Sequence, residues 1–278
     1  MQKSSRNLIL RFFDALLRIR ENLNLTIKVI LGVIPIFLIF LIWTFLTSGK
    51  SAEDRIISPV ILPSPKEVIL SIKTLWFEAE LTRSIIASGS RVIGGFAVGV
   101  IIAFPLGIFM GSFSKIRALF DPISVFGAYL PIPALIPLTM SLFGIGEFQK
   151  IMFLSLAFIV YLLPLFVKAI EEIDDVYLQT AYTLGANKYQ IVKRIFLGIS
   201  FPRIFNAMRM GFGIGWTYII LAEMVAADRG LGHIIIIAQR RGPREHIYLV
   251  LVVIVIIAYI TDKIWVKIGR KLFPYQEE

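Results

Sequence analysis

The chain has 278 residues, of which 57% are hydrophobic and only 17% are charged. Its mean hydropathy of +0.79 is too high for a water-soluble domain, in which about a quarter of the residues carry charge. The absence of cysteine excludes disulfides, thiolate zinc sites and iron–sulfur ligation, and two histidines offer little material for a metal centre. We therefore expect a membrane protein that holds no cofactor of its own.

Long apolar stretches follow one another along most of the chain, and a helix needs about 20 such residues to cross a bilayer. The candidate spans are 27–48, 92–111, 121–146, 151–167, 204–227 and 247–265. Residues 1–26 form an arginine-rich amphipathic lead that fits a cleaved signal peptide poorly. The sequence predicts one all-α, polytopic membrane bundle over residues 1–278, with about six transmembrane helices.

Lysine and arginine gather before the first candidate span and after the last one, which predicts that both chain ends are cytoplasmic. With six spans, segment 171–203 is then also cytoplasmic and segment 49–88 lies outside. In the outer segment, Ser64 and Glu67 form a possible capping box, which predicts an interfacial helix running through Trp76. The net charge of +10 is typical of a chain anchored beside anionic membrane lipid, so we expect no nucleic acid partner.

Small residues recur every four positions in the second span, at Gly95, Gly99, Ala103, Gly107 and Gly111. In lipid, such a ridge lets the backbone of another helix approach closely. The fifth span also contains a group of small residues, Gly211, Gly213 and Gly215, which permit bending as well as close packing. The plain interpretation of both ridges is helix packing.

Three prolines in the third span, Pro131, Pro133 and Pro137, remove backbone donors and are expected to break or kink the helix. Breaks at membrane depth occur only against protein or a water-filled cavity. Pro133 is therefore a candidate for lining a translocation pathway. A packed structural kink is the alternative.

The fifth span carries two ionisable residues, Arg209 and Glu223, and such residues inside a membrane segment are functional candidates. Trp216 and Tyr218 lie between them along the chain. All four are candidates for the translocation pathway. As alternatives, Arg209 could extend to the lipid phosphates, and the two aromatic residues could simply fill the bundle.

The segment from Asp174 to Pro202 reads as a helical hairpin. Gly185 follows a short helix and is predicted to adopt positive φ at its end, and Tyr189, Val192 and Phe196 give the next helix an apolar face. A hairpin of this kind projecting from a membrane bundle offers a compact surface to a cytosolic partner. A solvated hairpin is the simpler alternative.

This segment resembles the EAA loop of ABC importer permeases, whose pattern is Glu-Ala-Ala, three residues, Gly, nine residues, then Ile-x-Leu-Pro. Gln179 and Thr180 replace the Glu and the first Ala, whereas Ala181 and Gly185 agree with the pattern. Further along, Gly198 replaces the first proline, and the residues that agree are Ile195, Leu197 and, as a second proline of the nitrate, sulfonate and taurine branch, Pro202.

Similarity to that branch, the permeases for nitrate, bicarbonate, aliphatic sulfonates and taurine, extends over nearly the whole chain. The matching motifs are Leu62-Pro63-Ser64-Pro65, Ser90-Arg91-Val92, Ala222-Glu223-Met224 and Gly230-Leu231-Gly232. The resemblance implies a non-catalytic subunit of a bacterial-type inner membrane. It also implies a small anion as the substrate.

Further expectations come from the same resemblance. Cytosolic ABC ATPase subunits would bind ATP and magnesium, a second permease copy would complete a dimer, and an external solute-binding protein would deliver the substrate. The sequence is consistent with ATP binding by other subunits, because Gly49-Lys50-Ser51 does not complete a P-loop. Thr44 stands where the first glycine of that motif is required. The resemblance assigns coupling to the ATPases to Gln179, Thr180, Ala181, Gly185 and Ala186.

Two other classes of protein compete with this interpretation. A stand-alone channel or a secondary carrier would be as hydrophobic, although no internal repeat is visible. An intramembrane hydrolase would need a nucleophile beside a base. Ser112 is predicted at the inner end of the bundle, whereas His233 and His246 are predicted at the outer end or beyond it.

Overall fold

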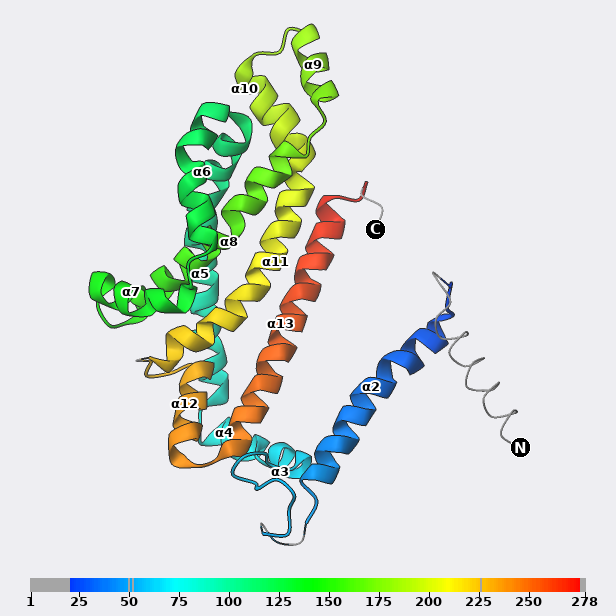
Figure 1. Ribbon diagram of the computed structural model, residues 1–278, viewed down its shortest axis with the longest axis vertical. Helices are drawn as coiled ribbons and strands as arrows, with labels where there is room; N and C mark the ends of the chain where they lie inside the picture. The colour runs from blue at the N-terminus through cyan, green and yellow to red at the C-terminus, as the bar shows by residue number, and fades with distance from the viewer. Residues whose placement is uncertain (1–20, 50, 52, 226, 276–278) are drawn as a thin grey trace. The chain divides into compact units, whose positions relative to one another are not determined.

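The computed structural model describes residues 21–49, 51, 53–225 and 227–275, so most of the predicted lead at 1–26 lies outside the described residues. The described residues form helices and no strand (Figure 1). The helices are α2 (Leu25–Leu46), α3 (Pro65–Leu70), α4 (Ile72–Phe77), α5 (Leu81–Ser112), α6 (Ser114–Ala128), η1 (Ile132–Ala134), α7 (Leu135–Phe143), α8 (Glu147–Glu171), α9 (Asp175–Thr183), α10 (Lys188–Gln190), the π-helix η2 (Ile191–Phe196), α11 (Leu197–Met224), α12 (Leu231–Arg241) and α13 (Arg244–Leu272). The predicted all-α fold class is confirmed.

The chain divides into two units, Met1–Pro65 and Lys66–Glu278. In the first unit, α2 covers the first predicted span with 22 residues of mean hydropathy 2.8. In the last turn of α2, the indole of Trp43 donates a hydrogen bond of 2.9 Å to the carbonyl of Pro63, which fixes the loop that follows α2 to the end of the helix.

Within the described part of the chain, four helices are long and apolar enough to cross a membrane on their own, namely α2, α5, α8 and α13. A fifth span results if the bent pair of α6 with η1 and α7 is one crossing. The 28-residue α11 covers the fifth predicted span, but it is not among the helices that are apolar enough to cross a membrane by this criterion. The count of about six spans and the cytoplasmic placement of both ends therefore stay predictions.

The third predicted span, 121–146, is not one straight helix. Ser114–Ala128 and Ile132–Phe143 meet at an angle of 92°, and Pro131 and Pro133 stand at the break. Proline has no N–H to donate and forces the residue before it out of the helical region, which explains the break. The predicted interruption is confirmed.

The predicted interfacial helix through Trp76 is two short helices, α3 and α4, separated at Ser71. The Ser71 hydroxyl donates to the carbonyl of Val68 at 2.8 Å, and Thr74 Oγ1 donates to the carbonyl of Ser71 at 2.9 Å. These side-chain bonds compete with the helical pattern. The chain is nevertheless helical on both sides of Ser71 as far as Phe77, and helical backbone bonds continue across Ser71, so the predicted helix is present with a one-residue interruption. Its position at the membrane interface stays a prediction.

The core of the second unit is the seam between α5 and α8. A Cβ added to Gly95, Gly99 or Gly107 would lie 2.5–2.7 Å from the Cβ of Leu154, Phe158 or Phe166, respectively. Both rows repeat every four residues, so the two ridges interdigitate. Without glycine the helices could not approach this closely, and the predicted packing role of the ridge is confirmed.

Helix α11 packs across the same seam. A Cβ at Gly211 would meet Leu162 at 2.6 Å, and one at Gly215 would meet the ring of Phe158 at 2.5 Å. Gly213 has open space around it. Two of the three predicted glycines therefore serve close packing, while the third faces away from the core.

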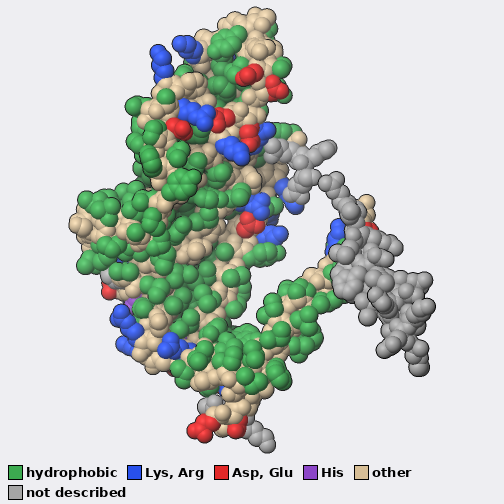
Figure 2. Space-filling view, viewed as in Figure 1, with side chains coloured by type: hydrophobic (Ala, Val, Ile, Leu, Met, Phe, Trp, Pro, Cys, Tyr) green, Lys and Arg blue, Asp and Glu red, His purple; other side chains and the backbone are tan. Residues whose placement is uncertain are grey.

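In the Lys66–Glu278 unit, α9 and α10 project from one end, which we call the hairpin end, and α4 and α12 lie at the opposite end (Figure 1). Hydrophobic side chains cover much of the visible face between the ends, and charged side chains gather mainly toward the ends (Figure 2). This distribution is the one expected of a bundle surrounded by lipid.

Candidate functional site

The hairpin begins at a capped helix. Asp174 is the N-cap of α9, and its carboxylate accepts a hydrogen bond of 2.9 Å from the backbone N–H of Val176. This bond satisfies one of the donors that the first turn of a helix leaves open. The start of α9 is therefore fixed by its own sequence.

Gly185 ends α9 with φ of +76°, as its position predicted. The N–H of Gly185 donates to the carbonyl of Tyr182, and the N–H of Ala186 donates to the carbonyl of Ala181, both at 2.9 Å. These two bonds are a Schellman motif, in which a residue in the left-handed region reverses the chain. The hairpin turn therefore depends on the one residue type that adopts this φ without strain.

The second arm starts with a capping box. The side chain of Asn187 accepts from the N–H of Gln190 at 2.9 Å, and the side chain of Gln190 accepts from the N–H of Asn187 at 2.8 Å. From Lys188 the chain stays helical through α10, η2 and α11. The hairpin is thus joined without a flexible linker to a helix of the bundle.

The structure brings the five predicted coupling residues together around this turn. Gln179, Thr180 and Gly185 are exposed, Ala186 is half-buried, and Ala181 is buried. Large apolar side chains are also exposed on the hairpin: Val176, Tyr177, Tyr182, Leu184 and Tyr189. Leu184 is 81% exposed. A cluster of this kind on a membrane protein's polar end is typical of a docking surface.

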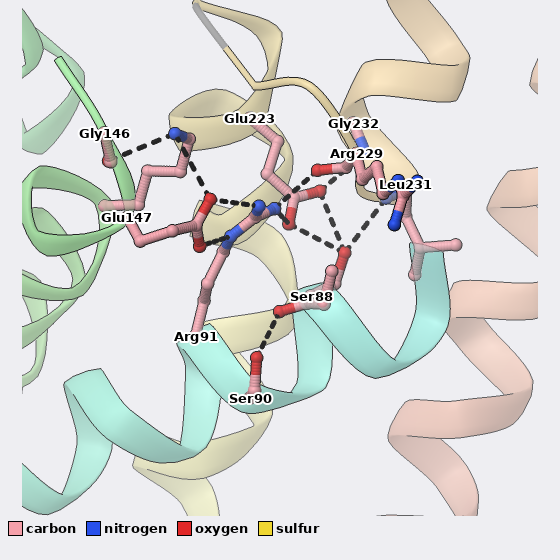
Figure 3. A network of polar contacts seen from close by, with 11 residues as sticks. Ser88, Ser90, Arg91, Gly146, Glu147, Glu223, Arg229, Leu231 and Gly232 are labelled. Atoms are coloured by element: carbon pink, nitrogen blue, oxygen red, sulfur yellow. Dashed lines mark hydrogen bonds and ion pairs between the residues drawn. The ribbon is translucent and has the colours of Figure 1, made fainter. Parts of the chain in front are cut away.

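A second polar site lies at the opposite half of the bundle, and we call it the buried junction. Its hub is Arg91 in α5, whose side chain is only 4% exposed. The guanidinium binds both carboxylate oxygens of Glu147 at 2.6 Å and one oxygen of Glu223 at 2.6 Å. Figure 3 shows Arg91 between these two carboxylates. The junction therefore joins α5, α8 and α11 through one side chain.

The carboxylate of Glu223 is fully buried and accepts hydrogen bonds from several groups. Ser88 donates to it at 2.7 Å and the backbone N–H of Gly232 donates at 2.9 Å. A Cβ at Gly230 would lie 2.3 Å from this carboxylate. The Gly230-Leu231-Gly232 motif thus contains glycine because the loop before α12 wraps directly around the buried charge.

Two further bonds fix this loop to α5. The N–H of Leu231 donates to the hydroxyl of Ser88 at 2.9 Å, and Arg91 donates to the carbonyl of Arg229 at 2.7 Å. The junction consequently ties α12 to α5 as well. Buried ions that are paired and hydrogen-bonded in this way are tolerated in a low-dielectric interior.

The structure separates the predicted pathway residues. Glu223 belongs to the buried junction, and Trp216 is 4% exposed. Arg209 is bound to Asp262 of α13 by two hydrogen bonds of 2.6 and 3.0 Å. Tyr218 is half-buried, and Pro133 is exposed at the bend between α6 and α7. These five residues therefore do not form one cluster, and their pathway role stays a prediction.

Sequence reasoning missed Arg91, Glu147 and Asp262 as functional candidates. Arg91 was placed at the edge of a span, but α5 begins at Leu81, so this arginine lies well inside the helix. Asp262 lies inside α13, which extends to Leu272. Ionisable residues inside apolar stretches usually pair with one another within the bundle, and this rule is the signal that could have linked each arginine to an acidic partner. Among the described residues, no group of three or more His, Asp or Glu side chains could hold a metal ion.

Comparison with protein families decides the identity. The family model described as "Binding-protein-dependent transport system inner membrane component" matches residues 95–268, well over half of the chain. The chain belongs to this family. It is a transmembrane permease subunit of the ABC importers, an inner-membrane protein of the kind that the EAA-like hairpin indicated.

Curated relatives of this permease agree with the branch that the sequence motifs indicated. The taurine transport system permease protein TauC of Escherichia coli (strain K12) is 30% identical over 234 residues, which cover 82% of this chain and 84% of the relative. The nitrate import permease protein NrtB of Synechocystis sp. is 25% identical over 266 residues, covering 90% and 92%. A probable ABC transporter permease of Brucella abortus (strain 2308) is 33% identical over 218 residues, covering 78% and 87%.

Solved structures show the same fold. A chain of the MetNI methionine ABC transporter in an inward facing conformation has a TM-score of 0.65 and 22% identity, over 72% of this permease and 98% of that chain. A chain of an amino acid ABC transporter has a TM-score of 0.62 and 13% identity, over 72% and 97%. The permease thus has the helical arrangement of ABC importer subunits.

Proposed function

We propose that this permease forms the pathway by which a small anion of the sulfonate or nitrate class enters the cell, driven by separate ATPase subunits. Family membership and the Schellman-terminated hairpin carry the proposal. The relatives named for taurine, aliphatic sulfonates and nitrate support the substrate class. On this proposal the permease is not an enzyme, and ATP and magnesium bind only to the partner subunits.

The proposed complex contains two copies of the permease, two cytosolic ATPases and a solute-binding protein on the outer side. In this arrangement the hairpin at 171–203 faces the cytosol, and segment 49–88 faces the binding protein. The exposed apolar side chains of the hairpin support the assignment of the ATPase contact, because they lack a covering partner within the described unit.

Coupling is proposed to act through the rigidity of the hairpin. Gln179 and Thr180 would contact the ATPase directly, since both are exposed. Ala181, Gly185 and Ala186 would hold the turn, because their backbone groups form or flank the Schellman bonds. Closure of the ATPases would then move α9, and the continuous helix from Lys188 into α11 would pass the motion to the bundle.

The pathway is proposed to run past Arg209, Tyr218 and Pro133, which are accessible in whole or in part. Trp216 and Glu223 would support its wall from behind, in keeping with their burial. A guanidinium that is already neutralised by Asp262 would guide a weakly held anion rather than trap it.

The substrate class is tested by reconstituting the permease with its ATPase and its solute-binding protein. ATP hydrolysis is measured with taurine, an alkyl sulfonate, nitrate or bicarbonate, and with a neutral and a cationic solute as controls. We expect stimulation by one or more anions only. Stimulation by the neutral or cationic solute alone would reject the anion class, and uptake that persists with an inactive ATPase would favour a secondary carrier.

Coupling is tested by Gly185→Val. A β-branched residue resists positive φ, and the strain of about 1–3 kcal/mol should distort the turn. We expect uptake to fall severalfold while ATP hydrolysis persists. Gly242→Val is the matched control, because Gly242 also has positive φ (+105°) and open surroundings but lies at the other end of the bundle. Equal losses of uptake in both variants would remove Gly185 from the coupling mechanism.

A further inference from the structure

A cavity of about 300 Å³ lies at the end of the bundle opposite the hairpin, beside α4 and α12 (Figure 1). Its lining comes from the link between α4 and α5, the loop before α12, α12 itself and the start of α13. All of these residues belong to the Lys66–Glu278 unit. On the proposed topology this end faces the outside, where the solute arrives.

The cavity is lined by charges of both signs. Glu78 and Asp228 contribute carboxylates, and neither carboxylate forms a hydrogen bond or an ion pair with another described residue. The guanidinium of Arg241 is likewise unpaired within the described ranges. Arg229 approaches Glu80 at 3.6 Å, which is too long for a hydrogen bond. Carboxylates and guanidinium groups are therefore both available to a ligand in one cavity.

A buried hydroxyl also belongs to the lining. Ser84 of α5 is only 3% exposed, and its hydroxyl makes no hydrogen bond to any residue that the structure describes. Ser88, one turn further along α5, instead donates to Glu223 and accepts from Leu231 in the buried junction. Because buried polar groups nearly always have a partner, an unpartnered hydroxyl in the wall of a cavity points to a bound group there.

The backbone around the cavity is held in an uncommon conformation. Glu80 has φ of +49° and ψ of +46°, and it is the one non-glycine residue of the described chain with positive φ. Its carboxylate is bound by Arg83 at 2.6 Å. Elsewhere in the wall, Nε2 of His246 lies 2.9 Å from Oγ1 of Thr74, which joins α13 to α4. Strained backbone held by such contacts is typical of binding sites.

We infer that this cavity is a receiving site for a small zwitterion that carries an ammonium group and a sulfonate group. The carboxylates of Glu78 and Asp228 suit the ammonium group. The guanidinium groups of Arg229 and Arg241, together with the Ser84 hydroxyl, suit the sulfonate oxygens.

The mixed lining favours a zwitterion over a simple ion. A plain anion such as nitrate would leave two carboxylates without a cation, and a plain cation would leave the arginines without an anion. A zwitterion satisfies both sets of charges at once. The inference rests on the proposed function and narrows its substrate class to amino-sulfonates such as taurine.

The test measures the binding of radiolabelled taurine to the permease–ATPase complex in nanodiscs, by equilibrium dialysis and without any solute-binding protein. Unlabelled ethanesulfonate lacks the ammonium group, and ethylamine lacks the sulfonate group. We expect saturable binding of taurine, and each analogue should compete about tenfold more weakly because it leaves one set of charges unpaired. Ethanesulfonate that competes as strongly as taurine would overturn the zwitterion site, and so would the absence of saturable binding.

Charge variants test which half of the ligand each side chain binds. Glu78→Gln with Asp228→Asn should weaken taurine binding severalfold and reduce the preference for taurine over ethanesulfonate. Arg241→Gln should instead reduce the preference for taurine over ethylamine. Arg240→Gln is the matched control, since Arg240 is the neighbouring exposed arginine of α12 and lies outside the lining. Equal losses in the two arginine variants would show a diffuse charge effect and overturn the site.

Ser84→Ala separates binding from folding. The hydroxyl has no partner among the described residues, so its removal should leave the thermal unfolding midpoint unchanged or slightly raised. If the hydroxyl contacts the sulfonate, the same variant should bind taurine severalfold more weakly. Unchanged taurine affinity together with an intact midpoint would overturn the inference.

The failure of this inference is distinguishable from that of the proposed function, because the binding assay involves neither transport nor a solute-binding protein. If the reconstituted importer responds to nitrate but not to taurine, and its permease does not bind taurine, the zwitterion site is overturned and the anion pathway stands. If no anion stimulates ATP hydrolysis while taurine still binds with the expected preferences, the site stands and the proposed substrate class of the pathway fails.

Discussion

The hairpin and the buried junction are built from opposite kinds of contact. In the hairpin, the capping and turn bonds at Asp174, Gly185 and Asn187 join residues no more than a few positions apart. In the junction, Ser88 is 135 positions from Glu223, and Arg91 is 56 positions from Glu147. One structure is local and exposed, and the other is long-range and buried.

This difference shows how the two ends of the bundle can serve one mechanism. A hairpin whose shape is fixed by its own hydrogen bonds keeps that shape when it moves, so it can act as a rigid lever. The junction instead ties α5, α11 and α12 together, because Arg91 and Glu223 are buried charges that cannot separate without a large cost in free energy. It adds α8 through Glu147, whose side chain is 62% exposed. Force applied at the hairpin should therefore move that block of helices as one body.

The largest effect is expected from Arg91→Met. It removes the hub and leaves the carboxylate of Glu223 buried without a charged partner, which should lower the free energy of unfolding by about 3–5 kcal/mol. Thermal unfolding of the purified permease in detergent measures the loss. Arg83→Met is the matched control on the same helix, because that side chain is 61% exposed and its pair with Glu80 should contribute about 0–1 kcal/mol.

Adding Glu223→Gln to Arg91→Met tests whether Arg91 and Glu223 stabilise the junction as a pair. Neutralising the orphaned carboxylate should recover part of the lost stability, since the buried charge is gone while Ser88 and Gly232 still have an acceptor. The single variant Glu223→Gln completes the cycle: a double variant whose loss of stability equals the sum of the two single losses would mean that these two residues are not energetically coupled. The junction would then be a set of separate contacts.

A smaller effect is expected in the seam that the junction holds together. Gly95→Ala would place a Cβ 2.5 Å from the Cβ of Leu154, whereas Gly94→Ala would find its nearest neighbour, Ile151, at 3.5 Å. Overpacking at Gly95 should cost about 1–3 kcal/mol. Gly94→Ala should be neutral or slightly stabilising, because alanine favours the helix. Equal unfolding midpoints for the two variants would contradict the close approach of α5 and α8.

The features that could be predicted from sequence are those with local or periodic signals. The positive φ of Gly185 follows from its position after a short helix, and the small-residue ridge follows from its four-residue spacing. The break near Pro131 follows from the missing N–H of proline. Each of these features needs only a few neighbouring residues to specify it, and each is confirmed.

The buried junction could not be predicted in the same way. A charged residue ends an apolar window, so Arg91 was taken as the border of a span, although α5 continues for ten residues before it. Its partners are 56 and 132 positions away, and no local pattern relates them. Likewise, Arg209 was visible as a lone charge, but its partner Asp262 is 53 positions further along. Tertiary packing alone brings these charges together.

The smallest effect is expected at the hairpin, where Asp174→Ala removes the cap of α9. The cost should be about 1 kcal/mol and should stay local, because the lost bond joins only Asp174 and Val176. Hydrogen exchange should become faster for the amides of α9 and stay unchanged for those of α5 and α8. Asp174→Asn is the control, since asparagine removes the charge but caps equally well. Faster exchange in α5 as well would mean that the hairpin is not an independent unit, and the contrast with the junction, where one side chain supports four helices, would fail.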